Sequence, residues 1–217
     1  MSKFKTQKMR TFFITFFLTA FAFTKTSGQS SSDASSSSSA SSSSHASSLT
    51  KAPILYDGPC PQITGVTLDY CKTAGVWYEV QRSVNNFDGE GCQILTWGKP
   101  TKGFSRIITT KISANSKSNS TTTAVVKANN QAQFFNYDFP TVGNFGKEYF
   151  PLTINYRRYA IVWGCENRGD KHIETAWIFA RKPKKPCKIE ALMRDAYAKY
   201  NLTVPEMYDH NLSLCIV

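Results

Sequence analysis

The sequence has no apolar segment long enough to span a membrane as a helix. Its longest apolar run, residues 11–23, has about 13 residues, whereas a membrane-spanning helix needs about 20. Four basic residues precede this run, and small residues follow it at positions 26–28. This order is typical of a secretory signal peptide. We therefore expect residues 1–28 to be a signal peptide and the protein to be secreted, without a transmembrane segment.

Motifs for catalysis and metal binding are also scarce. The three histidines, His45, His172 and His210, lie in no recognisable motif with a Ser or Cys nucleophile, and no two of them have the spacing of metal ligands. The sequence has no glycine-rich phosphate loop. We expect neither an enzyme nor a metal site, and no cofactor other than a bound pigment or lipid.

Basic residues outnumber acidic ones in the sequence, which has 26 Lys and Arg and 15 Asp and Glu and therefore a formal net charge of +11. Removal of residues 1–28 takes away five basic residues and no acidic one, which leaves 11 − 5 = +6. A basic run at residues 181–188 contains two prolines and no aromatic residue, although nucleic-acid surfaces use aromatic side chains for base stacking. We interpret the run as a solvated face that does not bind nucleic acid, and weak attraction to anionic surfaces stays open.

Residues 27–50 are almost entirely Ser and Ala. Such a segment buries too little apolar surface to offset the entropy lost on ordering. We expect residues 29–52 to form a disordered linker, either a flexible tether or an O-glycosylated stalk. Residues 53–217 are then the folded part, and their number suits a single domain with a substantial core.

All six cysteines lie in this folded part, namely Cys60, Cys71, Cys92, Cys165, Cys187 and Cys215. An even number in a secreted chain predicts three disulfides, with 15 connectivities open. Zinc binding is disfavoured because no two cysteines are two to four residues apart and no histidine lies beside one. The sequons at Asn119, Asn201 and Asn211 are predicted N-glycosylation sites.

Short apolar or alternating segments follow one another from Gly75 to Arg181 and are separated by Gly, Asn, Pro and Ser clusters. This spacing predicts an all-β sandwich or barrel. The eight expected strands are 76–82, 91–97, 104–113, 121–128, 132–139, 148–154, 159–164 and 173–181. Several place large rings on one face, as Phe135, Tyr137 and Phe139 do. A barrel filled by its own side chains and a barrel that holds a ligand both fit this pattern.

The apolar period changes after Cys187. Apolar residues then recur every three or four positions, which predicts one amphipathic helix between Pro186 and Asn201. Its apolar stripe comprises Ile189, Leu192, Met193, Ala196, Tyr197 and Tyr200. A single helix cannot cover both faces of a sheet, so we expect it to pack on the outside of a barrel. Residues 202–217 show no clear period.

Three segments of the folded part are distinctive: residues 75–80, Gly-Val-Trp-Tyr-Glu-Val; residues 156–165; and residues 176–181, Ala-Trp-Ile-Phe-Ala-Arg. They resemble the lipocalin family, and in detail its apolipoprotein D and insect bilin-binding branch. The first segment matches the Gly-x-Trp signature of the family's first strand, and the other two are similar to the seventh and eighth strands. The second family signature, Thr-Asp-Tyr, falls on Ile154-Asn155-Tyr156, so the charge expected in that loop is missing. The resemblance covers residues 60–215.

The resemblance implies an eight-stranded antiparallel up-and-down β-barrel with one C-terminal α-helix packed outside. It gives Gly75, Trp77 and Arg181 a structural role at the closed end, where Arg181 packs across the Trp77 ring. It also implies the disulfides Cys60–Cys165 and Cys92–Cys215. The two remaining cysteines come just before Trp77 and just after Arg181, so we predict a third disulfide, Cys71–Cys187, at the same end.

The function that the resemblance implies is extracellular transport of a small hydrophobic ligand, such as a bilin, retinoid, fatty acid or steroid-like lipid. The predicted ligand-binding residues are Phe135, Tyr137, Tyr159, Ile161, Trp163, Trp177 and Phe179. For each of these, plain core filling is the competing interpretation, because the face of a strand reverses when its register slips by one. A cell-surface receptor is a further candidate partner. Two alternatives are a protein-interaction module that uses open-end loops such as residues 140–146, and a lipocalin-type isomerase or peroxidase, whose cysteine or histidine is missing.

Overall fold

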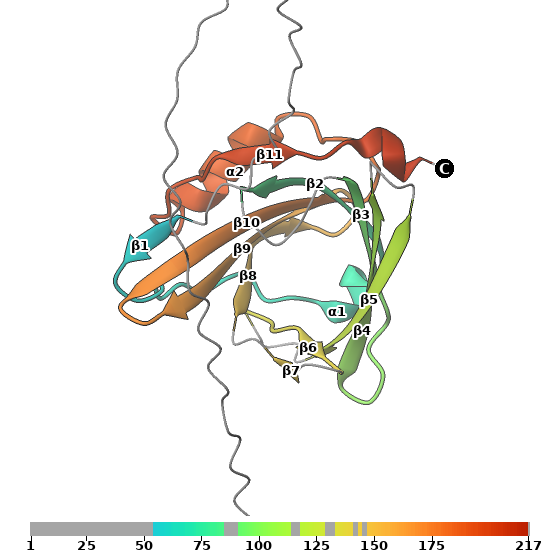
Figure 1. Cartoon of the computed structure of the whole chain (residues 1–217), viewed down its shortest axis with the longest axis horizontal. Helices are drawn as coiled ribbons and strands as arrows, with labels where there is room; N and C mark the ends of the chain where they lie inside the picture. The colour runs from blue at the N-terminus through green and yellow to red at the C-terminus, as the bar shows by residue number, and fades with distance from the viewer. Residues whose placement is uncertain are drawn as a thin grey trace, which may run out of the picture. The chain divides into compact units, whose positions relative to one another are not determined.

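One antiparallel sheet makes up most of the fold (Figure 1). The structure, a computed structural model, describes residues 54–84, 91–113, 118–128, 133–140, 143–144 and 147–216, all within the unit Ser47–Val217. The elements in chain order are β1 (Leu55–Asp57), α1 (Tyr70–Thr73), β2 (Gly75–Ser83), β3 (Gly91–Trp97), β4 (Phe104–Ser113), β5 (Asn119–Lys127), β6 (Asp138–Phe139), β7 (Gly143–Asn144), β8 (Glu148–Asn155), β9 (Tyr159–Arg168), β10 (Lys171–Ala180), α2 (Ile189–Ala198), β11 (Met207–Asp209) and the 3₁₀-helix η1 (Leu212–Cys215).

The strand order is β7-β6-β5-β4-β3-β2-β10-β9-β8, and the first and last long strands of the chain lie side by side because β2 pairs with β10. The sheet curls so that its two outer edges meet at an isolated β-bridge between Phe135 and Tyr149. The two backbone N–H groups each donate to the partner's carbonyl, at 2.9 and 3.0 Å. The predicted all-β barrel with up-and-down connections is therefore confirmed, and within the described residues this isolated bridge joins the two edges of the sheet.

Seven of the eight expected strands are present as β2–β5 and β8–β10. The expected strand at 132–139 is wrong as a continuous strand, because only Asp138–Phe139 form β6 and residue 132 lies outside the described residues. The alternation within it is correct. Phe135, Tyr137 and Phe139 lie on one side, with neighbouring ring centroids 5.4 and 6.2 Å apart. These rings pack against one another inside the barrel, while the ladder to β5 forms only at Asp138.

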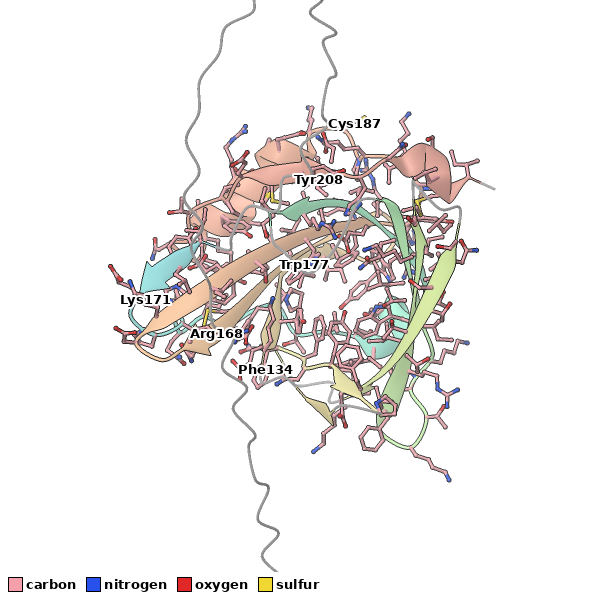
Figure 2. The ribbon with its side chains drawn as sticks, in the orientation of Figure 1. Phe134, Arg168, Lys171, Trp177, Cys187 and Tyr208 are labelled. Carbon is pink, nitrogen blue, oxygen red and sulfur yellow. A yellow bond between two sulfur atoms is a disulfide. The ribbon has the colours of Figure 1, made fainter. Side chains whose placement is uncertain are left out.

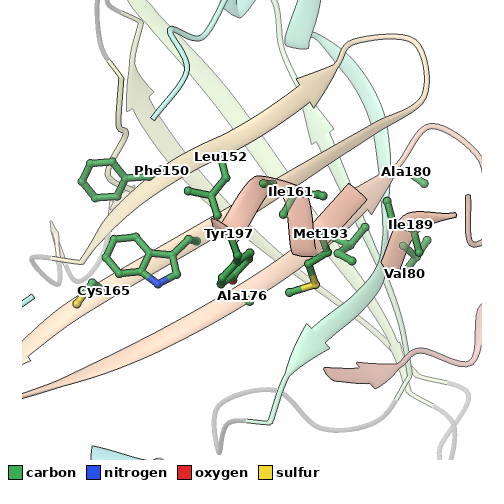
Figure 3. Packing of buried hydrophobic residues seen from close by; sticks show 13 residues of the cluster. Val80, Phe150, Leu152, Ile161, Cys165, Ala176, Ala180, Ile189, Met193 and Tyr197 are labelled. Atoms are coloured by element: carbon green, nitrogen blue, oxygen red, sulfur yellow. The ribbon is translucent and has the colours of Figure 1, made fainter. Parts of the chain in front are cut away.

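The sheet has a buried cluster on each of its two faces. On the outer face, Ile161, Ala176 and Ile178 pack against α2 (Figure 3). On the inner face, Trp77, Val162 and other side chains fill the closed half of the barrel. Because adjacent residues of a strand point to opposite faces, β9 and β10 supply both clusters at once.

Helix α2 confirms the predicted amphipathic helix and its position outside the sheet. The whole predicted stripe contributes to the outer cluster, with Ile189, Met193, Ala196 and Tyr197 buried. Asn201 follows the helix with a φ of 55°, a left-handed conformation that Asn tolerates better than most residues. The helix therefore ends where the sequence predicted.

The C-terminal segment beyond α2 extends the sheet. Strand β11 pairs with Gln81–Ser83 of β2, whereas β3 pairs with β2 only at Gly75–Tyr78. The segment thus occupies the edge of β2 that β3 leaves free near the open end. Disulfide Cys92–Cys215 ties its end to β3. Residues 202–217 show no apolar period because they form two short elements, β11 and η1, instead of one long helix or strand.

Two of the three predicted disulfides are confirmed, Cys60–Cys165 and Cys92–Cys215. The predicted bridge Cys71–Cys187 is wrong, since both cysteines are free and exposed. A disulfide requires Cα atoms within about 7 Å. Cys71 lies in α1 at the closed end, whereas residues 182–188 leave that end and carry Cys187 to the start of α2 outside the barrel (Figures 1 and 2).

We predict that the bridged and the free cysteine pairs differ sharply in their effect on stability. Replacing Cys60 and Cys165 by Ala removes a cross-link that spans 105 residues, and the unfolding free energy should fall by roughly 4–5 kcal/mol. Replacing Cys71 and Cys187 by Ser is the control and should change it by less than about 0.5 kcal/mol. Urea denaturation measures both, and a large loss in the control would reveal a third bridge.

Candidate functional site

The closed end of the barrel is sealed by one cation over one indole ring. The Arg181 guanidinium carbon lies 3.8 Å from the centre of the Trp77 ring. Nε of Arg181 donates to the Tyr156 carbonyl at 2.9 Å, and Nη1 donates to the Val76 carbonyl at 3.0 Å. Its Nη2 donates to the Lys72 carbonyl at 2.9 Å. One side chain thus joins α1, β2 and the turn between β8 and β9, as the predicted structural role requires.

Other contacts at this end fix the same elements. Trp77 is buried, and its indole N–H donates to the Thr73 carbonyl at 2.8 Å. Gly75 has a φ of 107°, and a Cβ there would lie 3.0 Å from Nη1 of Arg181, so a side chain would disturb the guanidinium. Asn155, where the sequence departs from the Thr-Asp-Tyr signature, still accepts a hydrogen bond from the Arg157 backbone N–H at 3.1 Å. The loop is closed without the missing charge.

Above the sealed end lies a cavity of about 270 Å³. A second, apolar void of about 30 Å³ lies next to Trp77. Leu95, Tyr137, Val162 and Phe179 line both. The large cavity therefore begins directly above the packed layer that covers Trp77.

The two sides of the large cavity differ in chemistry. The aromatic side is formed by Tyr137, Phe139, Tyr149, Trp177 and Phe179. Its rings are in contact, with centroids 4.7 Å apart for Tyr137 and Tyr149 and 5.4 Å apart for Tyr149 and Trp177. Figure 2 shows Trp177 inside the curl of the sheet. This side offers flat apolar surfaces to a bound molecule.

The opposite side comes from β3, β4 and β5 and is mostly polar. It is lined by Gln93, Thr109, Lys111, Ser120 and Thr122. Amide, hydroxyl and ammonium groups there can donate hydrogen bonds. A molecule in this cavity therefore meets rings on one side and hydrogen-bonding groups on the other.

Tyr137 lies between the cavity and the void beneath it. Burial raises the pKa of its phenol well above the ordinary value, and the neighbouring Tyr149, Glu79 and Tyr70 act in the same direction. The phenol is consequently neutral at physiological pH. It adds a neutral polar group to the aromatic side.

A buried polar cluster borders the cavity where β2 and β3 separate. The Glu79 carboxylate is 1 % exposed and lies 2.7 Å from Nε2 of His210. Nε2 of Gln93 donates to Oε2 of Glu79 at 3.0 Å, and Nη1 of Arg82 lies 3.7 Å from Oε1, the oxygen that faces His210. On its other side, Nδ1 of His210 lies 2.9 Å from the Gly91 carbonyl oxygen. His210 thus connects the C-terminal segment to the wall of the cavity.

Both ring nitrogens of His210 have a buried polar partner, the Gly91 carbonyl oxygen for Nδ1 and the Glu79 carboxylate for Nε2. Loss of either His210 or Glu79 would leave the other buried without its main polar contact.

The cavity contains three of the seven predicted ligand-binding residues, Tyr137, Trp177 and Phe179. A fourth, Phe135, lines the small apolar void. The assignment of Tyr159, Ile161 and Trp163 to the ligand wall is wrong, because all three belong to the outer cluster under α2. On β9 the inner face is formed by Ala160 and Val162 instead. The prediction of β9 as a strand is correct, but the prediction of which of its faces points into the barrel is wrong.

The polar side of the cavity and Glu79 were not predicted. The sequence signal for this polar side was the alternation of side chains between the two faces of β4 and β5. Thr109 and Lys111 lie on one face of β4, and Ser120, Thr122 and Ala124 lie on one face of β5. These polar residues gave no indication of which face points inward.

The open-end loop at 140–146 lies largely outside the described residues. In the described part of the chain, there is no metal-binding cluster and no helix with the length and apolarity of a membrane span.

Comparison with known proteins supports the architecture. No family model matches the sequence. Insecticyanin from the tobacco hornworm Manduca sexta superposes with a TM-score of 0.63 at 17 % identity over 73 % of this chain and 89 % of that chain. Lobster apocrustacyanin A1 gives 0.59 at 16 % identity over 72 % and 89 %. The cockroach allergen Per a 4 gives 0.57 at 22 % identity over 74 % and 98 %.

These similarities show that the chain has the lipocalin fold. The identities are too low to show more than the fold. The predicted branch within the family is not confirmed.

We predict that the contact between His210 and Glu79 stabilises the wall of the cavity. His210→Ala should lower the unfolding free energy by about 3 kcal/mol, because the buried Glu79 carboxylate loses its shortest polar contact and keeps Gln93 and the more distant Arg82. In the double variant with Glu79→Gln the additional loss should be small, since the two residues act as a unit. Asp209→Asn, an exposed neighbour, is the control. If His210→Ala costs no more than this control in urea denaturation, the pair has no such role.

Proposed function

We propose that this protein, which has a lipocalin fold, is a secreted carrier that binds one small, largely apolar molecule inside the barrel. The observation that carries the proposal is the cavity of about 270 Å³ above a sealed closed end. Ligand sites are concave and mostly apolar, with a few polar groups that fix the orientation of the ligand. The aromatic side and the polar side of this cavity together meet that description.

The two sides also specify the form of the ligand. The volume lies near the lower end of the range for small-molecule pockets, about 300–1,000 Å³, which favours a compact molecule. Trp177, Tyr149 and Phe179 suit a flat ring system, since aromatic rings stack with an offset or edge to face. Lys111, with Thr109 and Thr122 on the same side, suits a hydrogen-bond acceptor or an anionic group at one edge of the ligand.

Secretion is part of the proposal. Two disulfides cross-link the described residues, and disulfides persist in oxidising compartments such as the extracellular space. The sequon residues Asn119, Asn201 and Asn211 are all exposed, which fits N-glycosylation in the secretory pathway. The expected signal peptide, residues 1–28, lies outside the described residues.

Ligand titration of matched variants tests this function. The probes are retinol and 1-anilinonaphthalene-8-sulfonate, a compact ring system with one anionic group, and binding is followed by fluorescence. Trp177→Ala removes a ring from the cavity and should weaken binding about tenfold or more, because contact between two aromatic rings contributes roughly 0.5–1.5 kcal/mol beyond the apolar area that they bury. Tyr159→Ala is the control, since Tyr159 packs on the outer face.

The control should bind each probe as tightly as the unmodified protein does. Equal losses in the two variants would indicate general destabilisation. Saturable binding of a probe that neither variant weakens would place the site elsewhere and contradict the proposal.

A further inference from the structure

Exposed cations gather at the closed end of the barrel, away from the mouth of the cavity. The first group lies on the hairpin between β3 and β4 and at the end of β5, and it comprises Lys99, Lys102, Arg106 and Lys127. The second group lies on the turn between β8 and β9 and directly after β10, and it comprises Arg157, Arg158 and Lys182. All seven side chains are exposed. We call them the closed-end cations.

The antiparallel topology places both groups at one end. Strands β3, β5, β8 and β10 finish there, whereas β2, β4 and β9 begin there. The backbone N–H of Arg181 donates to the Arg158 carbonyl at 3.0 Å, which brings the two segments of the second group together. Strand β2 joins the groups, because it pairs with β3 on one side and with β10 on the other.

These cations have almost no acidic neighbours. Within the described residues none of the seven forms an ion pair, and the only carboxylate on the α1 side of this end, Asp69, pairs with Lys72 at 3.0 Å. Asp138 lies at the border, on the strand next to Lys127 and two strands away from Arg106. At the open tip of β9 and β10, where Figure 2 labels Arg168 and Lys171, the pattern is different.

At that tip, cations and carboxylates are matched. Arg168 pairs with Glu166 at 2.7 Å, and Lys171 pairs with Asp57 at 2.7 Å. The imbalance at the closed end is therefore a property of that end and does not simply reflect the net charge of the chain.

A large apolar side chain stands among the closed-end cations. Phe104 is 50 % exposed. It lies directly opposite Lys127 in the ladder and two residues before Arg106 on the same strand, so the three share the outer face of the sheet. Val76, at the start of β2, is also 40 % exposed. A polysaccharide or a nucleic-acid backbone would use the cations and leave Phe104 without an apolar environment.

We propose that the closed end docks on an anionic phospholipid membrane. The closed-end cations would lie against the negatively charged headgroups, and Phe104 would enter the boundary between headgroups and acyl chains, as apolar residues of peripheral proteins do. In this orientation the mouth of the cavity faces the solution. Docking is independent of the cavity and of its ligand.

Vesicle flotation with the purified protein tests the docking. The protein should float with vesicles of phosphatidylcholine and phosphatidylserine at low ionic strength, and less so at high ionic strength, since the attraction is screened. It should not float with vesicles of phosphatidylcholine alone. The double variant Arg158→Gln with Lys182→Gln should bind about 30-fold more weakly, because each cation near the surface contributes roughly fivefold.

Two further variants make the test specific. Arg194→Gln with Lys199→Gln removes the same charge from α2 and its C-cap, and it should leave the affinity for vesicles within about threefold of the unmodified protein. Phe104→Ser should weaken vesicle binding about tenfold, while retention on a heparin column stays unchanged. Near-UV circular dichroism verifies that each variant is folded.

Three results would overturn the proposal. An equal loss in the α2 control would mean that only net charge matters. Unchanged vesicle binding by Phe104→Ser would remove the role of the apolar side chain. Tight retention on heparin without any flotation would identify a sulfated polysaccharide as the partner instead of a membrane.

Discussion

The stacking of Arg181 on Trp77 is the contact on which the rest of the barrel depends. The guanidinium stacks on the face of the indole ring. It also donates hydrogen bonds to backbone carbonyls of α1, β2 and the turn between β8 and β9. Hydrogen bonds from a charged donor are stronger than neutral ones, and here they satisfy carbonyls from three separate segments. The sealed end supports the packed layer around Trp77, and the cavity lies above that layer.

The second constraint is that β9 and β10 contribute side chains to two hydrophobic clusters, one on each face of the sheet. Ile161 and Ile178 pack under α2, whereas Val162 and Trp177 face the interior. One helix on the outer face is enough because the inner face is covered by the curl of the sheet itself. Inside that curl, polar residues of β4 and β5 line the cavity opposite the aromatic rings.

The architecture could be predicted because local pattern and family resemblance agreed. Turn clusters gave the strand positions, the three-to-four-residue period gave α2, and the resemblance gave the two long-range disulfides. The site could be predicted only in part. Which face of β9 points inward depends on pairing with β8 and β10, and no feature within residues 159–164 reveals it. His210 lies in a segment without a period, and its contact with Glu79 spans 131 residues of sequence. The wrong Cys71–Cys187 bridge has a similar cause, because proximity to Arg181 in sequence did not reveal that the chain then turns outward.

Native mass spectrometry of the protein purified from its natural source measures directly whether the cavity carries a ligand. Glycans and disulfides contribute equally under native and denaturing conditions, so a difference between the two masses reports only a non-covalently bound molecule. A carrier should show one small molecule per chain in the native spectrum, and denaturation should release it. Identical polypeptide masses under both conditions would contradict the assignment of this barrel as a ligand carrier.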